Sequence, residues 1–532
     1  MQFTFLTKNA RYLFITSLGM ALGMASCFIY FLDPLKVLIN KVTSLSPGSL
    51  AFSLWSNPPY DIFAKAYIYH VTNAEAFLSG KEKLRLEEKG PYVYKESIHN
   101  TQPKFNDNGT LTFIPVRYLE FIPELSVADP KTEMIVCPNI PLLGITAALQ
   151  NYSMFVNLAV SSVSSYLGSP SFVNTSVHDY LFGYDDPLVS LANKVVPNWI
   201  DFPRFGIIDR LLALDNSSNV ITISVDPSKK VSENTLLTLE ERTRAYAIQR
   251  WNGSPGLKVW GYKEPQGNET VQENSRCNLV EGTFEGLIFP RHLKRNTTFK
   301  LYRRAFCRPV PFVYESEGYT NEGFHSYTYT VADNFLAKGS ENPENQCFCL
   351  NGNCLPRGLG DMTPCYYDIP IVMSQPHFLN ADPSLLADVD GLSPDEEKHN
   401  TKFIIHPEMG LPLKANMKIQ INLRMTDTKY NHKTRPFNNL TLPLFWVELN
   451  ANEIPSSIYL YLTLLYHVLP VVQEVMMYVF ALSSIIIVSS TAYKFLFAVS
   501  NPQDTRRPKI NYRIVPLTKD DLLCPDEIMI RK

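Results

Sequence analysis

Polar and apolar residues alternate without a break from residue 417 to residue 425, in the sequence MKIQINLRM. Because successive side chains of a strand point to opposite sides of a sheet, this pattern predicts a half-buried antiparallel strand. Shorter runs of the same kind occupy residues 66–71, 111–116, 220–225 and 327–331, and Asn-Gly pairs at 108–109, 252–253 and 351–352 predict turns. The sequence therefore predicts a strand-rich core, built as a large antiparallel sheet or barrel.

Residues 145–167 follow helical spacing instead, with apolar side chains recurring at every third or fourth position. The stretch holds no charged residue, so a third membrane crossing is one interpretation. Its Gln, Asn and Ser residues would be poor lipid-facing groups, and we favour a helix of the folded domain. A second helix is predicted directly after it, where Ser176 and Asp179 form a cap signal and Gly183 and Pro187 form a stop signal.

Two long apolar segments lie near the ends of the chain. Residues 12–32 and residues 475–493 contain no charged side chain. At about 1.5 Å per residue, each can cross the roughly 30 Å hydrocarbon core of a bilayer as a helix. A cleaved signal peptide is the alternative for the first segment, since Ala25 and Ser26 are small residues. Signal peptides have shorter apolar stretches of about 7–15 residues, so we expect an uncleaved anchor.

Basic residues flank both segments on the side of the chain ends. Lys8 and Arg11 precede the first segment, and Lys494 follows the second. The positive-inside rule therefore predicts that both termini are cytosolic. The expected organisation is a cytosolic N-terminus at 1–11, a membrane helix at 12–32, a lumenal or extracellular domain at 33–474, a membrane helix at 475–493 and a cytosolic tail at 494–532.

N-glycosylation signals of the form N-x-[ST] lie only between the two apolar segments. They are Asn108, Asn151, Asn174, Asn216, Asn252, Asn268, Asn296 and Asn439. Their confinement to one region predicts a glycosylated surface in the secretory pathway.

Six of the nine cysteines cluster in the predicted outer domain. They are Cys277, Cys307, Cys347, Cys349, Cys354 and Cys365. In an oxidising compartment such a cluster predicts three disulfides, for which spacing alone permits many connectivities. A zinc site is the alternative, but C-x2-C pairs are absent and thiolate zinc sites mostly belong to reducing compartments. Cys27 lies in the first apolar segment, Cys137 is expected to be a buried free thiol, and Cys524 lies in the tail.

Charge and motifs exclude several classes of function. The 49 Lys and Arg residues nearly balance the 51 Asp and Glu residues, so nucleic acid is not an expected partner. No familiar catalytic or nucleotide-binding motif occurs. His399, His406 and Glu408 could ligate a metal, yet their turn-rich segment favours a solvated loop, and His377 is typical of a hydrogen-bonded structural imidazole. We expect no enzymatic activity, no cofactor and no metal; a receptor, an adhesion molecule or a carrier of apolar ligands remains.

Short motifs then extend across the chain in a recognisable order. They are EEKGPYVY at 87–94, LFGYDDPL at 181–188, FCRPVP at 306–311, the cysteines of 347–365, SQPHFL at 374–379, DGL at 390–392 and EKH at 397–399. With both apolar segments, this ordered set resembles the class B scavenger receptor family, which includes fatty-acid translocase-type receptors, the lysosomal integral membrane protein and insect sensory neuron membrane proteins. The sequence WIDFPRFGIIDR at 199–210 looks most like invertebrate members.

The resemblance implies an α+β fold, with an antiparallel β-barrel core and a helical bundle at its membrane-distal apex, at about residues 145–190. It also implies the disulfides Cys277–Cys347, Cys307–Cys365 and Cys349–Cys354, and an apolar tunnel from the apex toward the bilayer. Such a receptor would bind lipids or lipid particles and pass apolar ligand down the tunnel, because exposing a hydrocarbon chain to water costs about 0.8 kcal/mol per CH₂. The ligand would be a fatty acid, a sterol, a carotenoid, a phospholipid or a lipoprotein.

The predicted apex departs from relatives that capture modified lipoproteins with basic residues. Residues 145–167 have no basic side chain, so we expect weak binding of polyanions there. Contact would instead use apolar groups such as Tyr152, Phe155 and Val156, and a glycan at Asn151 could mask this surface. The second hypothesis is a lysosomal sorting receptor that binds a hydrolase through the apical helices, as the resemblance to the lysosomal relative implies.

The predicted tail holds two patterns that resemble sorting signals. Tyr512 and Val515 fit a Y-x-x-Φ pattern, and Leu522 and Leu523 fit an acidic dileucine pattern with imperfect spacing. Cytosolic sorting adaptors are therefore expected partners. The expected location is the endosomal or lysosomal membrane, or the plasma membrane.

Overall fold

The computed structural model describes residues 2–150, 152–198, 200–212, 219–229, 236–265 and 273–500 of the 532-residue chain. The chain divides into two compact units. The small unit comprises Met1–Leu38 and Leu465–Lys532, and the large unit comprises Ile39–Leu464. The large unit combines helices with one large, mainly antiparallel sheet, which confirms the predicted α+β class.

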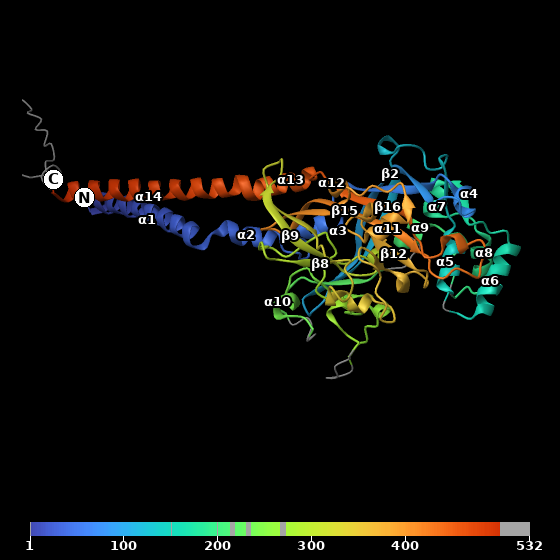
Figure 1. Ribbon diagram of the computed structural model, residues 1–532. Helices are drawn as coiled ribbons and strands as arrows, with labels where there is room; N and C mark the ends of the chain where they lie inside the picture. The colour runs from blue at the N-terminus through green and yellow to red at the C-terminus, as the bar shows by residue number, and fades with distance from the viewer. Residues whose placement is uncertain are drawn as a thin grey trace, which may run out of the picture. The chain divides into compact units, whose positions relative to one another are not determined.

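The small unit is a pair of long antiparallel helices, α1 (Gln2–Leu32) and α14 (Leu469–Ser500) (Figure 1). Two stretches, Ala10–Leu32 and Ser456–Phe497, are long and apolar enough to cross a membrane. They include the two predicted segments at 12–32 and 475–493. The cytosolic placement of their outer ends stays a prediction.

Small and hydroxyl residues line the contact between α1 and α14. Thr16 Oγ1 donates to Thr491 Oγ1 at 3.3 Å, and Ser26 Oγ donates to the carbonyl of Met477 at 3.0 Å. Without water in a bilayer core, such interhelical hydrogen bonds and close backbone packing are what hold two helices together.

Gly19 and Gly23 lie one turn apart on the same face of α1. A Cβ added at Gly19 would come within 2.9 Å of the Ile487 side chain, and one added at Gly23 within 2.8 Å of Ser484 Oγ. The missing side chains at these two positions let the helices approach closely here.

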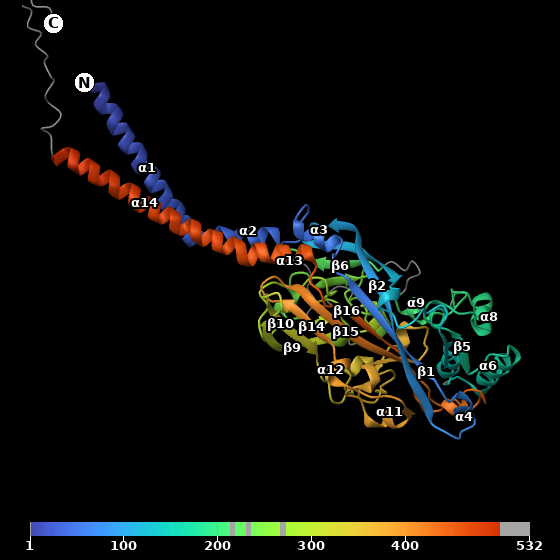
Figure 2. The ribbon, with the colours of Figure 1, turned by 90° about the horizontal axis from the view of Figure 1, so that it is seen from above.

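The sheet of the large unit follows one main path of hydrogen-bonded strands (Figure 2). In spatial order these are β7 (Ile248–Trp251), β6 (Ile221–Ser224), β3 (Thr110–Phe121), β2 (Leu84–Phe105), β1 (Ile62–Val71), β16 (Thr441–Ala451), β15 (Leu411–Arg424), β14 (Lys402–His406), β10 (His325–Val331), β9 (Val310–Tyr319) and β8 (Phe299–Leu301). β11 (Gly360–Asp361), β12 (Ile371–Ser374) and β13 (Val389–Asp390) pair beside this path, while β4 (Met134–Pro138) and β5 (Phe172–Ser176) form a separate pair. All five strands predicted from alternation are confirmed.

The predicted β-barrel is not confirmed, because the strand ladder is open between β7 and β8. A segment that is not itself a strand bridges these two edges. Ile248 N donates to the carbonyl of Thr283 at 2.7 Å, and Phe284 N donates to the carbonyl of Lys300 at 2.8 Å. The edge backbones are thus satisfied without a closed ladder.

Four helices gather at the end of the large unit opposite to α13 (Ser456–Thr463) (Figures 1 and 2). They are α5 (Ile140–Ala148), α6 (Met154–Tyr166), α7 (Val177–Phe182) and α8 (Pro187–Val195). The remaining helices are α2 (Pro34–Val42), α3 (Leu50–Ser56), α4 (Ala74–Leu78), α9 (Ile207–Leu212), α10 (Leu239–Arg242), α11 (Pro383–Ala387) and α12 (Glu396–His399). An apical bundle as the resemblance implies it stays a prediction.

The single helix predicted at 145–167 is wrong, because the chain breaks between α5 and α6. The amide of Asn157 accounts for the break. Its Nδ2 donates to the carbonyl of Leu149 at 3.1 Å and to that of Ser153 at 3.3 Å. These carbonyls border the turn, so one side chain fixes its shape where helical hydrogen bonds are interrupted.

The cap predicted for the next helix is confirmed, but its stop signal is only half right. Ser176 Oγ accepts from the N–H of Asp179 at 3.0 Å, and Gly183 follows the last residue of α7 with a φ of 149°. Pro187 does not end a helix. It begins α8, where Asp186 caps the first turn.

β15 has the predicted alternation, but its polar face is not open to solvent. Gln420 and Asn422 are both fully buried. Gln420 Oε1 accepts from the Tyr69 hydroxyl at 2.6 Å and from His377 N at 2.7 Å. Asn422 Nδ2 donates to Ser374 Oγ at 3.0 Å. The prediction of a half-buried strand is wrong here, because β12 and the His377 turn cover the polar face.

The large unit contains three disulfides, and their pairing is the one that the resemblance implies. They are Cys277–Cys347, Cys307–Cys365 and Cys349–Cys354. Cys137 is a buried free thiol, as predicted, and burial raises its pKa. Cys27 is exposed on α1, and Cys524 lies outside the described residues.

We expect Gly19→Leu to separate α1 from α14, because filling a tight contact costs about 1–3 kcal/mol. In a Cys27→Ala background, cysteines placed at Thr16 and Thr491 should form a disulfide when the full chain is oxidised in lipid nanodiscs. Adding Gly19→Leu should slow this cross-link by about fivefold or more.

Ala21→Leu is the matched control for this test, because Ala21 is exposed on α1. It adds the same side chain outside the contact and should leave the cross-link rate unchanged. Equal rates in both variants would show that the glycine contact does not hold the helices together.

Candidate ligand-binding site

The large unit contains two small, mainly apolar pockets, with cavity volumes of about 50 Å³ and 40 Å³. The first pocket is lined by Tyr60, Ile62, Gly286, Leu287, Arg303, Phe403, Pro412, Leu413, Lys414, Ala415, Met417, Leu449 and Ala451. The second pocket is lined by Phe306, Val310, Phe312, Val331, Phe335, Leu336, Met373, Ser374, Gln375, Thr401, Met417, Lys418, Ile419 and Leu449. Apolar walls with a few polar groups are typical of sites for small apolar ligands.

The two pockets are neighbours, because Met417 and Leu449 line both of them. These residues face each other across the ladder, where β15 pairs with β16. Methionine is unbranched and flexible, so its side chain can move more readily than a branched one. A change in the conformation of the Met417 side chain would therefore join or separate the two pockets.

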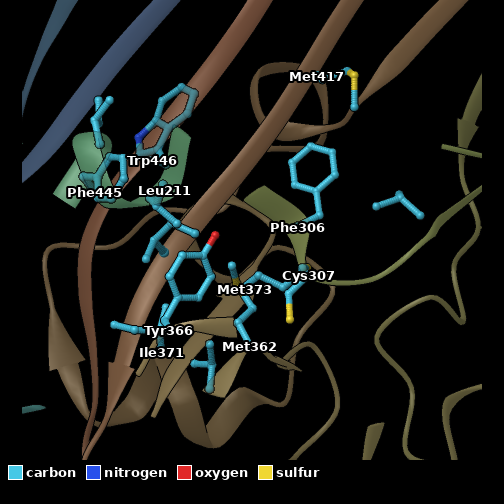
Figure 3. Packing of buried hydrophobic residues seen from close by; sticks show 14 of the residues in the cluster. Leu211, Phe306, Cys307, Met362, Tyr366, Ile371, Met373, Met417, Phe445 and Trp446 are labelled. Atoms are coloured by element: carbon cyan, nitrogen blue, oxygen red, sulfur yellow. The ribbon is translucent and has the colours of Figure 1, made fainter. Parts of the chain in front are cut away.

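One short segment, residues 303–307, contributes to both pockets. Arg303 lines the first pocket and Phe306 the second. Figure 3 shows Phe306 beside Cys307, with Met417 above Phe306 in the view. The segment is held by the Cys307–Cys365 disulfide and by Trp260, whose Nε1 donates to the carbonyl of Cys307 at 2.6 Å. Its position is therefore fixed by covalent and hydrogen-bonded structure.

Four charged residues meet behind the first pocket. Arg117 Nη1 donates to Glu96 Oε1 at 2.6 Å, and Arg117 Nη2 lies 3.9 Å from Glu285 Oε1. Burial raises the pKa of Glu285, whereas Arg117 and Arg303 outweigh burial at Glu96 and lower its pKa. Burial, reinforced by Arg117, lowers the pKa of Arg303 to about 10. Of these four residues, only Arg303 reaches the pocket wall.

A hydrogen-bonded cluster centred on the partly exposed Glu88 lies on the other side of β16. Glu88 Oε2 accepts from His377 Nε2 at 2.6 Å and from Trp446 Nε1 at 2.7 Å. Ser393 N donates to His377 Nδ1 at 3.1 Å. His377 is thus hydrogen-bonded through both ring nitrogens, as predicted, and its proton sits on Nε2.

His399 and His406 do not lie in a solvated loop, so that prediction is wrong. Both are buried. The ring of His399 stacks on that of His377 with centroids 4.4 Å apart, and burial, followed by the neighbouring His377, lowers the pKa of His399 to about 4. His406 instead contacts Glu408 at 3.0 Å. Among the described residues, no group of three potential ligands could hold a metal ion.

His325, which the sequence did not single out, is held between two carboxylates. Its Nε2 lies 2.8 Å from Glu317 Oε1, and its Nδ1 lies 2.9 Å from Glu408 Oε1. Carboxylates only accept, so both ring nitrogens donate and the ring is protonated. Burial lowers the pKa of His325, but the hydrogen bonds to Glu408 and Glu317 outweigh it and the pKa is raised. This cluster ties β9 and β10 to the turn before β15, which lines the first pocket.

The predicted apical contacts lie on an exposed apolar surface. Tyr152 is 62% exposed, Phe155 77% and Val156 37%. Met154, Leu158, Val163 and Tyr166 extend this surface along α6, and Tyr166 is 91% exposed. α6 carries no charged residue. Below, these residues are called the α6 surface.

The predicted glycosylation sites can be placed only in part. Asn108, Asn174, Asn252, Asn296 and Asn439 are all exposed, as a glycan requires. Asn151, Asn216 and Asn268 lie outside the described residues, as do the predicted sorting residues Tyr512, Val515, Leu522 and Leu523. Glycosylation and sorting stay predictions.

Comparison with known proteins gives a consistent result. The model of the CD36 family matches residues 15–495. Scavenger receptor class B member 1 of Cricetulus griseus is 30% identical over 447 residues, which cover 83% of this chain and 81% of that protein. The receptor of the same name from Sus scrofa is 29% identical over 413 residues, covering 77% and 75%. Lysosome membrane protein 2 of Homo sapiens is 28% identical over 411 residues, covering 77% and 78%.

The His325 cluster predicts a pH dependence of stability. The folded-state pKa of His325 is raised above its usual value of 6.5. Its contribution to the free energy of unfolding is therefore fully present below pH 6.5 and is lost as the pH rises through the folded-state pKa. The unfolding temperature of the full chain in detergent should therefore fall less between about pH 5.5 and pH 8.5 in His325→Gln than in the wild type.

The exposed His432 provides the control, since His432→Gln removes an imidazole from outside the cluster. This variant should keep the wild-type pH dependence. A wild-type profile in His325→Gln as well would mean that the two carboxylates do not stabilise the ring.

Proposed function

The chain belongs to the CD36 family, whose members are the class B scavenger receptors, and we propose from this premise that it binds lipid and passes apolar ligand through its interior to the membrane. It is a membrane receptor and not an enzyme, like the relatives named scavenger receptor class B member 1 and lysosome membrane protein 2. What we propose beyond this is that the ligand is a lipid and that it follows a route through the interior of the protein.

The pair of adjoining apolar pockets is the observation that carries this proposal. They adjoin at Met417 and Leu449, the two residues that line both of them. An apolar chain gains about 25 cal/mol for each Å² of surface that leaves water. A ligand moving from one pocket to the next would therefore stay out of water if Met417 turned aside.

β15 gives this route a direction. Its first residues line the first pocket, its middle lines the second, and its end points to the helices around α5. Just beyond the strand, the Thr426 hydroxyl donates to Gln150 Oε1, two residues after α5. We propose that ligand entering near these helices follows β15 to the end where the chain leaves the large unit.

The α6 surface favours a second function. Exposed apolar patches of this kind serve protein partners as well as lipids. We propose as the alternative that the chain binds a lysosomal hydrolase through α6 and carries it during sorting. The tail residues Tyr512, Val515, Leu522 and Leu523 would then bind cytosolic adaptors. Residence in the endosomal or lysosomal membrane fits this alternative, and residence in the plasma membrane fits the lipid receptor.

Met417→Trp should block the proposed route, because the larger ring fills the space that both pockets share. The full chain reconstituted in vesicles should transfer a fluorescent fatty acid or sterol from a lipid emulsion, and the variant should lose most of this transfer. Leu125→Trp enlarges a half-exposed side chain away from the pockets and should transfer normally. Normal transfer by a correctly folded Met417→Trp chain would rule out this route.

A separate experiment distinguishes the two functions. Native mass spectrometry of the purified chain should show bound lipid if it is a lipid receptor, and a bound hydrolase if it is a sorting receptor. Phe155→Ser with Tyr166→Ser should abolish hydrolase binding and leave bound lipid in place. Tyr319→Ser, which removes an exposed ring from β9, is the control and should change neither. Hydrolase binding that survives the α6 variant would exclude α6 as its contact.

A further inference from the structure

A third pocket of the large unit differs from the two apolar pockets in size and in chemistry. Its cavity volume is about 330 Å³, several times that of either apolar pocket. Residues of α10, β8 and β9 contribute to its lining. Polar and apolar side chains share the wall, with Leu237, Leu279 and Pro311 among the apolar ones. Such a mixed wall favours a ligand that has both apolar faces and hydrogen-bonding groups.

The charges in this wall balance one another. Its described residues include three cations and three carboxylates, which are Arg244, Arg276, Lys300, Glu241, Glu281 and Glu344. Arg276 pairs with Glu241, and Lys300 Nζ donates to Glu344 Oε2 at 2.7 Å. Arg244 Nη1 donates to the carbonyl of Thr298 at 3.0 Å. A wall without net charge does not favour an ionic ligand, whereas hydroxyl and amide groups can both donate to and accept from such polar groups.

A glycosylation signal lies at the edge of the third pocket. It consists of Asn296, Thr297 and Thr298; Asn296 is exposed, and Thr298 lines the pocket. Two residues span at most about 7 Å, so a group attached to Asn296 begins next to the cavity. The turn before β8 fixes this position, because Thr297 Oγ1 accepts from Lys294 N at 3.0 Å and Thr297 N donates to the carbonyl of Lys294 at 2.8 Å.

We propose that the third pocket holds the first sugar residues of an N-linked glycan on Asn296. The proposal concerns the chain's own glycan and does not depend on the lipid function proposed above. The first residues of such a glycan are uncharged N-acetylglucosamine units. Their rings have apolar faces, and their hydroxyl and acetamide groups donate and accept hydrogen bonds, which matches a neutral wall of mixed polarity. Because the glycan is tethered, its effective concentration at the pocket is on the order of millimolar, so weak contacts hold it in place.

Resistance of the glycan to enzymatic release tests this inference. The full chain is produced in mammalian cells, kept folded in detergent and treated with peptide-N-glycosidase, which cuts between the asparagine and the first sugar, and mass spectrometry follows each site. A seated glycan must leave the pocket before it is cut, so release at Asn296 should be at least about tenfold slower than at Asn439. Asn439 is exposed and lines none of the three pockets. After denaturation, the two sites should react at similar rates.

Two substitutions that fill the pocket should remove this protection. Ala332→Trp adds a ring from a half-buried position in the wall, and Asn334→Trp adds one from an exposed position in the wall. Each should raise release at Asn296 to the rate at Asn439. Asp333→Trp is the matched control, because Asp333 lies between them, is exposed and does not line the pocket. It should keep the wild-type protection.

An unglycosylated Asn296, or equal release at Asn296 and Asn439 in the folded wild type, would overturn the inference. Protection that survives both Ala332→Trp and Asn334→Trp would overturn it as well, because the shielding would then come from outside the pocket.

A glycan of another protein is the second source of the same sugars. Millimolar N,N′-diacetylchitobiose should bind to Asn296→Gln, whose pocket lacks the tethered glycan, and ligand-observed NMR measures this binding. The sugar should not bind to the glycosylated wild type. Binding to both chains would show that the pocket is open to the glycans of partners, and binding to neither would show that it does not hold sugar. Either result contradicts the proposal.

Discussion

Empty apolar space inside a protein tends to close. The two pockets therefore depend on walls that are held apart and cannot collapse onto each other. A cavity costs about 24 cal/mol per Å³ in lost contacts, so neighbouring side chains gain by filling it. On one side, β15 is held between β14 and β16 by antiparallel ladders, each with one register shift. On the other side, the Cys307–Cys365 disulfide and Trp260 hold the segment 303–307. The wall of each pocket therefore combines a rigid sheet with an anchored turn.

Polar groups on the far side of β15 contribute to the same rigidity. Gln420 and Asn422 are buried and fully engaged with Tyr69, His377 and Ser374. A strand that slipped by one residue would exchange its two faces, so these amides would enter the pockets and Met417 would meet the polar network. Each amide would then lose partners at a cost of about 1–3 kcal/mol. The buried network thus fixes which side chains of β15 line the pockets.

The features that could be predicted from sequence are those that local pattern controls. Alternation located β15, and a serine with an acid three residues later located the start of α7. The break between α5 and α6 could not be predicted, because Asn157 resembles any polar residue on a helix until its bonds to Leu149 and Ser153 are seen. The burial of His399 depends on stacking with His377 from another turn. The first pocket needs strands β1, β14, β15 and β16, which meet only in the fold.

The lack of charged residues on the α6 surface limits what this surface can recognise. The α6 surface carries no charge, so it cannot distinguish an ionised lipid from a neutral one. Charges on an exposed surface would in any case be screened within about 8 Å at physiological salt. Contact at this surface would therefore depend on the apolar area that a ligand or partner buries, and not on its charge.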